Sequence, residues 1–344
     1  MSMKFVCRTL LCGMVLVSSS TWAAGAKVFV ADEGSDTLTV IDAASFKKLA
    51  TIPVGRGPHN VQLSPDGKRA WVTTNGERGS GAKDEHAGHG NAHEPASGQG
   101  QIWGIDTETH AVVAKHAVGL HPAHVVLTPN GRYAYVTNGG ENTVSVIELP
   151  AGKLAATIPV GAYPHGVRIS PDGREAYVAN LKDGSVSIID TASMKEAARL
   201  PVGKAPAQTG FTPDGRTAFV SLSGEDRVAL IDPVARKVLR KVPVGTVPIQ
   251  LYASLDGKQL FVANQGSRQR PGMTVSVIDI ASGKVTKSVR AGRGAHGVVV
   301  GTDGRYAYVT NTFENTVSVI DVASLTVVSS VPTGKAPNGI SLAP

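Results

Sequence analysis

One segment of about twenty residues recurs along the chain, and this repetition limits the possible folds more than any other feature. The copy at 118–138 reads VGLHPAHVVLTPNGRYAYVTN. Each copy is marked by the residue that precedes its first apolar stretch: Pro58, Pro122, Pro164, Pro206, Pro248, Ala295 and Pro337. These positions lie 64, 42, 42, 42, 47 and 42 residues apart, so the period is 42, with insertions of 22 and 5 residues. A fixed period of this length indicates a repeat architecture rather than two ordinary domains.

Each 42-residue unit predicts four short strands. In the unit that begins near Pro164, apolar residues alternate with polar ones over 165–169, 175–179, 185–190 and 197–201, and Ser-Pro-Asp-Gly at 170–173 forms a turn. This alternation and this turn are typical of antiparallel strands, and the 3.6-residue period of helices is absent. Four strands per repeat indicate the blades of a β-propeller.

The two ends of the chain complement each other. The chain enters the fold in the second strand of a blade, at 28–32, and ends on an inner strand, at 339–343. We expect the C-terminal strand to complete the N-terminal blade, which would close the ring and leave no exposed sheet edge. The fold class predicted for 24–344 is therefore all-β, a seven-bladed β-propeller of four-stranded antiparallel blades.

Residues 1–23 predict a secretory signal peptide. Lys4 and Arg8 precede an apolar run at 9–17, and small residues follow, with a cleavage site after Ala23. The apolar run is too short to span a bilayer, so we expect no membrane anchor and a periplasmic or secreted location. The two cysteines of the chain, Cys7 and Cys12, would be removed with this peptide, which leaves no thiol for a disulfide or a metal.

The repeat motifs carry a resemblance. YVTN at 135–138 and 308–311, together with PVGxxP, SPDG and VID, resembles the YVTN-repeat β-propeller family of secreted bacterial and archaeal proteins. The resemblance covers the whole mature chain and implies the propeller fold. It implies little about function, because relatives include surface-layer proteins, periplasmic binding proteins and the haem d-one domain of a nitrite reductase.

Histidines recur within one residue of the same repeat position, at the start of the inner strands. They are His59, His124, His165 and His296, and other copies carry Gln208, Gln250 and Asn338 nearby. In the strand order that the resemblance supplies, these positions surround the mouth of the central channel. Converging neutral imidazoles suit Zn, Cu or Ni, or the iron of a haem, whereas a single histidine there would only line the channel wall.

The 22-residue insertion adds a second group of histidines. Residues 77–100 are rich in Gly, Ser and Ala, which predicts a flexible loop, and they contain His86, His89 and His93 together with Asp84, Glu85 and Glu94. The loop is expected on the same face as the four inner-strand histidines. A loose His-rich loop above an ordered site resembles periplasmic zinc-chaperone propellers, although the same histidines could simply be solvated.

Motifs for enzymatic activity are missing from the sequence. It contains no GxSxG elbow, no Walker loop and no HExxH. Asp66, Asp172 and Asp214 stand in repeated turns, where Asp before Gly serves the turn itself. The net charge of +7 comes from scattered residues, with no aromatic-lined basic groove, so we expect no nucleic-acid partner.

The sequence thus predicts a non-enzymatic, monomeric periplasmic protein that binds or delivers Zn, Cu or Ni. His59, His124, His165 and His296 would form the metal site, His86, His89 and His93 would capture the ion, and a periplasmic metal-transport or redox protein would be the partner. Two alternatives stay open. One is a haem- or tetrapyrrole-associated redox propeller with a channel-mouth histidine as axial ligand, and the other is an interaction scaffold without a ligand.

Overall fold

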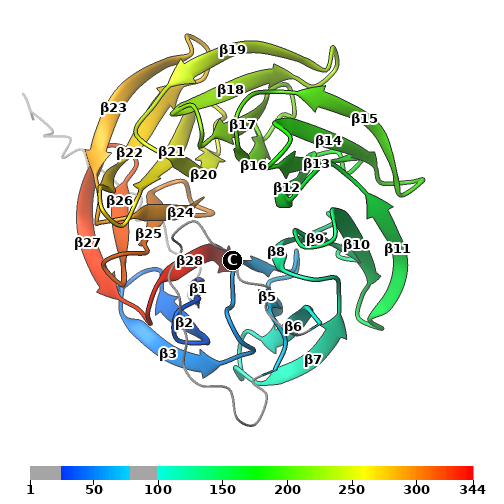
Figure 1. Ribbon diagram of the computed structural model, residues 1–344. Helices are drawn as coiled ribbons and strands as arrows, with labels where there is room; N and C mark the ends of the chain where they lie inside the picture. Colours follow the sequence, from blue (N-terminus) through cyan, green and yellow to red (C-terminus); the bar gives the residue numbers. More distant parts are fainter. Residues whose placement is uncertain (1–24, 78–98, 344) are drawn as a thin grey trace, which may run out of the picture.

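Seven four-stranded antiparallel sheets surround a central channel, as the sequence predicts (Figure 1). The computed structural model describes residues 25–77 and 99–343. The predicted signal peptide and His86, His89 and His93 lie outside these residues. Within the described part, no helix is long and apolar enough to cross a membrane.

The strands occupy the same four places in every blade. The innermost strands are β28 (Pro337–Ala343), β4 (Val61–Leu63), β8 (Pro122–Leu127), β12 (Pro164–Ile169), β16 (Pro206–Phe211), β20 (Pro248–Ala253) and β24 (Ala295–Val300). The second strands are β1 (Lys27–Asp32), β5 (Arg69–Thr74), β9 (Tyr133–Asn138), β13 (Glu175–Asn180), β17 (Ala218–Leu222), β21 (Gln259–Gly266) and β25 (Tyr306–Asn311).

The two outer places are filled in the same way. The third strands are β2 (Thr37–Asp42), β6 (Gln101–Asp106), β10 (Thr143–Glu148), β14 (Ser185–Asp190), β18 (Arg227–Asp232), β22 (Pro271–Asp279) and β26 (Thr316–Asp321). The fourth strands, on the rim, are β3 (Lys48–Pro53), β7 (Val112–Ala117), β11 (Lys153–Pro159), β15 (Lys195–Pro201), β19 (Lys237–Pro243), β23 (Lys284–Arg290) and β27 (Thr326–Pro332).

Ring closure occurs where the sequence predicts it. The C-terminal strand β28 pairs antiparallel with β1, with Val28 opposite Leu342, so one blade contains both ends of the propeller. This pairing leaves the sheet edge of β1 covered, which removes a template for aggregation.

The core lies between the blades. The second and third strands are almost fully buried, whereas the fourth strands alternate between exposed and half-buried residues. Tyr135, Tyr177 and Tyr308, from the repeated motif, are each fully buried between neighbouring sheets. Both faces of each middle strand therefore need apolar residues, which explains why alternation is weakest there.

In four blades the second strand carries the asparagine of the repeated motif, and its side-chain amide bonds to the neighbouring third strand. The Asn138 amide donates to Thr143 Oγ1 and Ser145 Oγ, at 3.0 and 2.9 Å, and its carbonyl accepts from the Gly119 backbone at 3.1 Å. Asn311 repeats these bonds with Thr316, Ser318 and Gly292. These bonds hold the loops of the channel-mouth face against each other.

Candidate metal centre

The inner strands carry a bulge near the channel mouth. In β12 the register with β13 shifts between Pro164 and Val167, so the two residues between them leave the ladder, and five more inner strands shift at the same place. A bulge bends a strand and turns its side chains in new directions. His165 is the first of the two bulge residues and His124 is the second in its own strand. Both can therefore face the channel, although a regular strand would send them to opposite sides.

The threonine of the repeated motif positions these bulges. Thr137 Oγ1 accepts from the His124 backbone N–H at 3.0 Å and donates to the His165 carbonyl at 2.6 Å. One hydroxyl thus ties the bulges of two neighbouring blades together. Thr73 does the same for Asn60 and Ala123.

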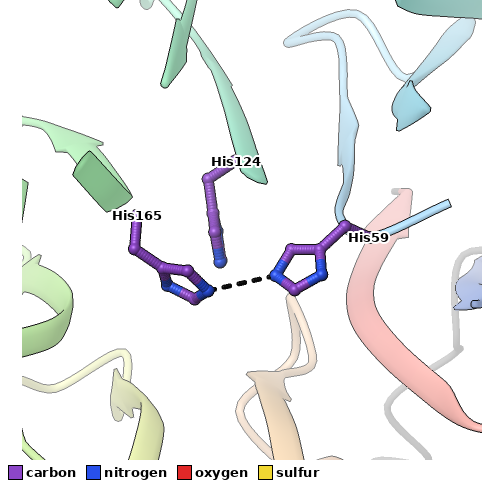
Figure 2. A group of neighbouring side chains, drawn as sticks. All are labelled: His59, His124 and His165. Atoms are coloured by element: carbon purple, nitrogen blue, oxygen red, sulfur yellow. Dashed lines mark hydrogen bonds between the residues drawn. The ribbon is translucent and has the colours of Figure 1, made fainter. Parts of the chain in front are cut away.

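Three of the four predicted channel-mouth histidines meet. Figure 2 shows the imidazoles of His59, His124 and His165 pointing toward one another from three blades. One ring nitrogen from each lies within 4.8 Å of the others. The closest pair is His59 Nε2 and His165 Nε2, 3.1 Å apart. The structure thus brings together three of the four inner-strand histidines that the sequence singles out.

The hydrogen bond on the far side of His165 fixes its tautomer. His165 Nδ1 lies 2.9 Å from the backbone carbonyl of Ala207. A carbonyl only accepts, so Nδ1 carries the proton and the Nε2 lone pair of the neutral ring points to His59 Nε2. A proton on His59 Nε2 makes this contact an ordinary hydrogen bond, which agrees with the Asn338 amide nitrogen that faces His59 Nδ1, and a cation that both lone pairs bind is the alternative. Two imidazole nitrogens on one tetrahedral Zn²⁺ are about 3.3 Å apart, given Zn–N bonds near 2.05 Å.

His124 is the most deeply buried member. It has no exposed surface, and its Nε2 has no hydrogen-bond partner among the described residues. Burial, followed by the nearby charges of His165 and His59, holds the pKa of His124 well below its usual value. The ring is therefore neutral at pH 7, which is the form that binds metals.

Gln208 lies behind His124. Its side-chain amide nitrogen is 3.4 Å from His124 Nδ1, and its amide oxygen accepts from the Thr209 backbone at 3.2 Å. In this orientation the amide donates to Nδ1, and a half-turn of the amide would instead place its oxygen toward Nδ1–H and leave the Nε2 lone pair for a metal, as outer partners of metal-binding histidines commonly arrange. The sequence comparison noted Gln208 only as an equivalent position; its role becomes visible from the side-chain contact.

A carboxylate beside His59 was not predicted. Glu33 Oε1 lies 3.5 Å from His59 Nδ1, and Glu33 Oε2 accepts from the Asn338 amide at 2.6 Å. The Asn338 amide is also 3.1 Å from His59 Nδ1. Glu33 directly follows the second strand of the N-terminal blade, so its loop opens on the same face as the histidines. The place of Glu33 directly after a second strand is the sequence feature from which its location near the histidines could have been predicted.

The fourth predicted histidine of the channel mouth, His296, lies at the edge of this cluster. Its ring centroid is 6.4 Å from that of His59, and it is not one of the three whose nitrogens converge. Two further histidines lie elsewhere. His121 lines a cavity on the same face with Tyr163 and Lys182. His116 stacks on Trp71, 5.5 Å between ring centroids.

The turn aspartates serve the turns. Asp66 Oδ1 accepts from the Ser64 hydroxyl at 2.6 Å and from the Lys68 backbone at 3.1 Å, and the bond from Ser64 is the largest cause of its lowered pKa. Asp172 and Asp214 repeat this geometry.

Comparison with known families gives one match. The sequence matches the family described as "Lactonase, 7-bladed beta-propeller" over residues 19–195 and, in an overlapping match, over 104–302. A search of curated proteins finds no match. The kinship with YVTN-repeat proteins and the likeness of the His-rich loop stay predictions.

Solved structures share the propeller. A hydrazine synthase structure from Kuenenia stuttgartiensis aligns with a TM-score of 0.69 and 23% identity, over 82% of this chain and 88% of that one. A protein of unknown function from Desulfotomaculum acetoxidans gives 0.72 and 18%, over 92% and 98%. The dihydro-heme d1 dehydrogenase NirN in complex with DHE gives 0.66 and 17%, over 92% and 74%. At these identities the likeness shows the fold alone.

Proposed function

This chain belongs to the "Lactonase, 7-bladed beta-propeller" family, and from that premise we propose that it is a propeller that binds a transition metal at its channel mouth. His59, His124 and His165 would be the ligands. The protein would hold the ion for delivery rather than use it in a reaction.

The contact between His59 Nε2 and His165 Nε2 carries this proposal. The Ala207 carbonyl directs the His165 lone pair toward His59, and the 3.1 Å separation is close to that of two ligands on one ion. His124 adds a third imidazole kept neutral by burial. Three imidazole nitrogens without a thiol suit Zn(II), Cu(II) or Ni(II).

Glu33 would tune this centre. A carboxylate next to the Nδ1 of a metal-binding histidine fixes the ring and raises its basicity. The negative charge of Glu33 also lies close enough to offset part of the charge of a divalent ion.

We base the proposed cellular location, capture residues and partner on the sequence alone. After export to the periplasm as a monomer, His86, His89 and His93 would capture the ion above the channel mouth, and a periplasmic metal-transport or redox protein would receive it. Replacing these three histidines with Ala should slow metal uptake but leave the equilibrium affinity of the channel site unchanged. An unchanged uptake rate would remove this segment from the proposal.

Titration of the metal-free protein tests the main proposal. We expect Zn, Cu or Ni to bind one ion per chain and to raise the stability by about 2.7 kcal/mol at a free concentration 100 times the dissociation constant. The variant His59→Asn/His124→Gln/His165→Asn should lose this effect. Each substitution introduces a residue that another blade carries at its own bulge or next to it, so the ring should still fold.

A tetrapyrrole-binding function is the second candidate. A solved structure with this fold is described as a complex with DHE. The channel-mouth face also has a cavity of about 440 Å³, lined by residues that include His121, Tyr163 and Lys182. A visible absorption band after reconstitution with haem, lost on replacing His121 or the clustered histidines, would favour this candidate over metal delivery.

The family description suggests lactone hydrolysis as a possible activity. We propose that this chain does not hydrolyse lactones. Asp66, Asp172 and Asp214 are committed to turns. Metal-dependent opening of simple lactones by the purified protein, abolished by His124→Gln, would contradict this part of the proposal.

A further inference from the structure

One basic residue belongs to an inner strand deeper in the ring than the histidines. Arg168 is the fourth residue after Pro164, beyond the bulge of β12. The equivalent residues of the other inner strands are Gln62, Val126, Gly210, Tyr252, Val299 and Ser341. Arg168 is thus the one cation at this level of the repeat, and its side chain is half-buried.

The protein does little to neutralise this charge. Within 25–77 and 99–343, the guanidinium makes one hydrogen bond, to the Val167 carbonyl at 3.2 Å, and no carboxylate lies within 4.0 Å of it. A guanidinium has five N–H donors, so most remain available. Burial lowers the pKa of Arg168, and the phenol of Tyr252 is the one group that opposes this effect. A cation that is partly withdrawn from water commonly has an anionic partner.

Arg168 lies close enough to the histidine cluster to affect its charge balance. The positive charge of Arg168 contributes to the lowered pKa of His124. On β16, the strand between β12 and β20, the equivalent residue is Gly210, and the ring of Phe219 occupies the space where a side chain at this position would lie. Tyr252, whose ionised phenol would raise the pKa of Arg168, belongs to β20.

A second unused donor lies on β20. Gln250 occupies the bulge of this strand, two residues before Tyr252, and is 2% exposed. Its amide nitrogen has no hydrogen-bond partner among the described residues. A buried N–H group without an acceptor is costly, and an acceptor atom on a ligand would satisfy it.

We propose that this part of the ring binds a small oxyanion, a carboxylate or a phosphate, through the guanidinium of Arg168 and the amide of Gln250. The planar fork of arginine matches the two oxygens of either group. The inference goes beyond the proposed function, because the anion site needs no metal. An ion on the histidines would add positive charge nearby and tighten the binding of the anion.

Thermal unfolding of the metal-free protein tests this site. The protein is treated with a chelator to remove metal, and the chelator is then removed by gel filtration. The melting temperature is measured in Tris buffer with added phosphate, acetate or chloride at the same ionic strength. We expect phosphate or acetate, but not chloride, to raise the melting temperature of the wild type. In Arg168→Met the apparent dissociation constant should rise about tenfold or more. Arg174→Met, an exposed arginine of the same blade paired with Asp172 at 3.7 Å, is the matched control.

The outcome separates this site from the metal centre. Arg168→Gln gives a second variant if Arg168→Met does not fold, and zinc titration of either variant should still give one ion per chain. A response to phosphate alone or to acetate alone supports the site and identifies its ligand class. No response of the wild type to either oxyanion, or equal responses of the wild type and the Arg168 variants, would overturn the proposal whether or not zinc binds.

Discussion

His59 Nε2 and His165 Nε2 lie 3.1 Å apart, although the two residues are 106 positions apart in the chain and belong to blades separated by a third. The intervening blade supplies His124, so three consecutive blades converge on one point. The bulges of the inner strands allow this convergence, because they turn either of two successive side chains into the channel.

Loss of one ligand should weaken the metal centre strongly. Changes to the outer hydrogen-bond partners of metal ligands typically lower metal affinity about 10- to 100-fold. We expect His165→Asn to lower zinc affinity by more than this, because it removes a bond to the ion. Competition with a chromophoric chelator measures the affinity. His116→Asn, a histidine stacked on Trp71, is the control and should bind zinc like the wild type. Equal losses in both variants would contradict the assignment.

Gln208 should act through His124. Replacing it with Leu removes the polar group 3.4 Å from His124 Nδ1 while keeping similar volume. We expect zinc affinity to fall about 10- to 100-fold, with one ion still bound per chain. The same titration on Gln259→Leu, at the start of β21, provides the comparison. An unchanged affinity in Gln208→Leu would show that the amide does not orient the ring.

His124 should make the metal-free protein less stable in acid. Its pKa in the folded state lies well below its usual value, so below about pH 6.5 the unfolded chain takes up a proton that the folded chain does not. The contribution falls by about 1.4 kcal/mol per pH unit between the unfolded and the folded pKa. The free energy of unfolding of His124→Gln should therefore depend on pH less steeply than that of the wild type, by this slope. Parallel curves from urea unfolding at pH 7.5 to 5.5 would contradict this account.

Asp32 should affect the pH dependence of stability in the opposite direction to His124. It occupies the place of Asn138 in the N-terminal blade, and burial raises its pKa to about 6. A raised pKa stabilises the fold below the unfolded value of 3.8, and this contribution is lost as the pH rises through 6. We expect Asp32→Asn to stabilise the protein at pH 7.5 by up to about 3 kcal/mol, at about 1.4 kcal/mol per pKa unit. The gain should shrink toward pH 4.

The stability gain expected for Asp32→Asn depends on the orientation of two hydroxyl groups. Thr37 and Thr39 donate to Asp32 at 3.0 and 2.7 Å, and an amide would need them as acceptors instead. Asn138 makes such bonds to Thr143 and Ser145. A variant that is less stable than the wild type at pH 7.5 would show that the hydroxyls do not reorient.

The sequence predicts the fold well because each repeat repeats the same local signals. The strand at 185–190 is found where it is predicted, and the ends of the chain pair as expected. The strand expected at 197–201 begins earlier, at Lys195, because the charged residues Lys195 and Glu196 extend the pairing with β14 but give no apolar signal in the sequence.

The site was predicted only in part. Repeat alignment finds His59, His124 and His165, but it treats His296 as equivalent to them, and the structure places His296 at one side. Glu33 and Arg168 have no counterpart of their kind in the other repeats, so the alignment gives no reason to select them. Their proximity to the histidines depends on ring closure and on the bulges, which only the three-dimensional arrangement reveals.

Elemental analysis of the protein, purified without a histidine tag and without chelators, tests the central claim most directly. The account predicts close to one Zn, Cu or Ni per chain in the wild type and none in His59→Asn/His124→Gln/His165→Asn. A metal-free wild type that also fails to take up these ions on titration, or a triple variant with the same metal content as the wild type, would contradict it.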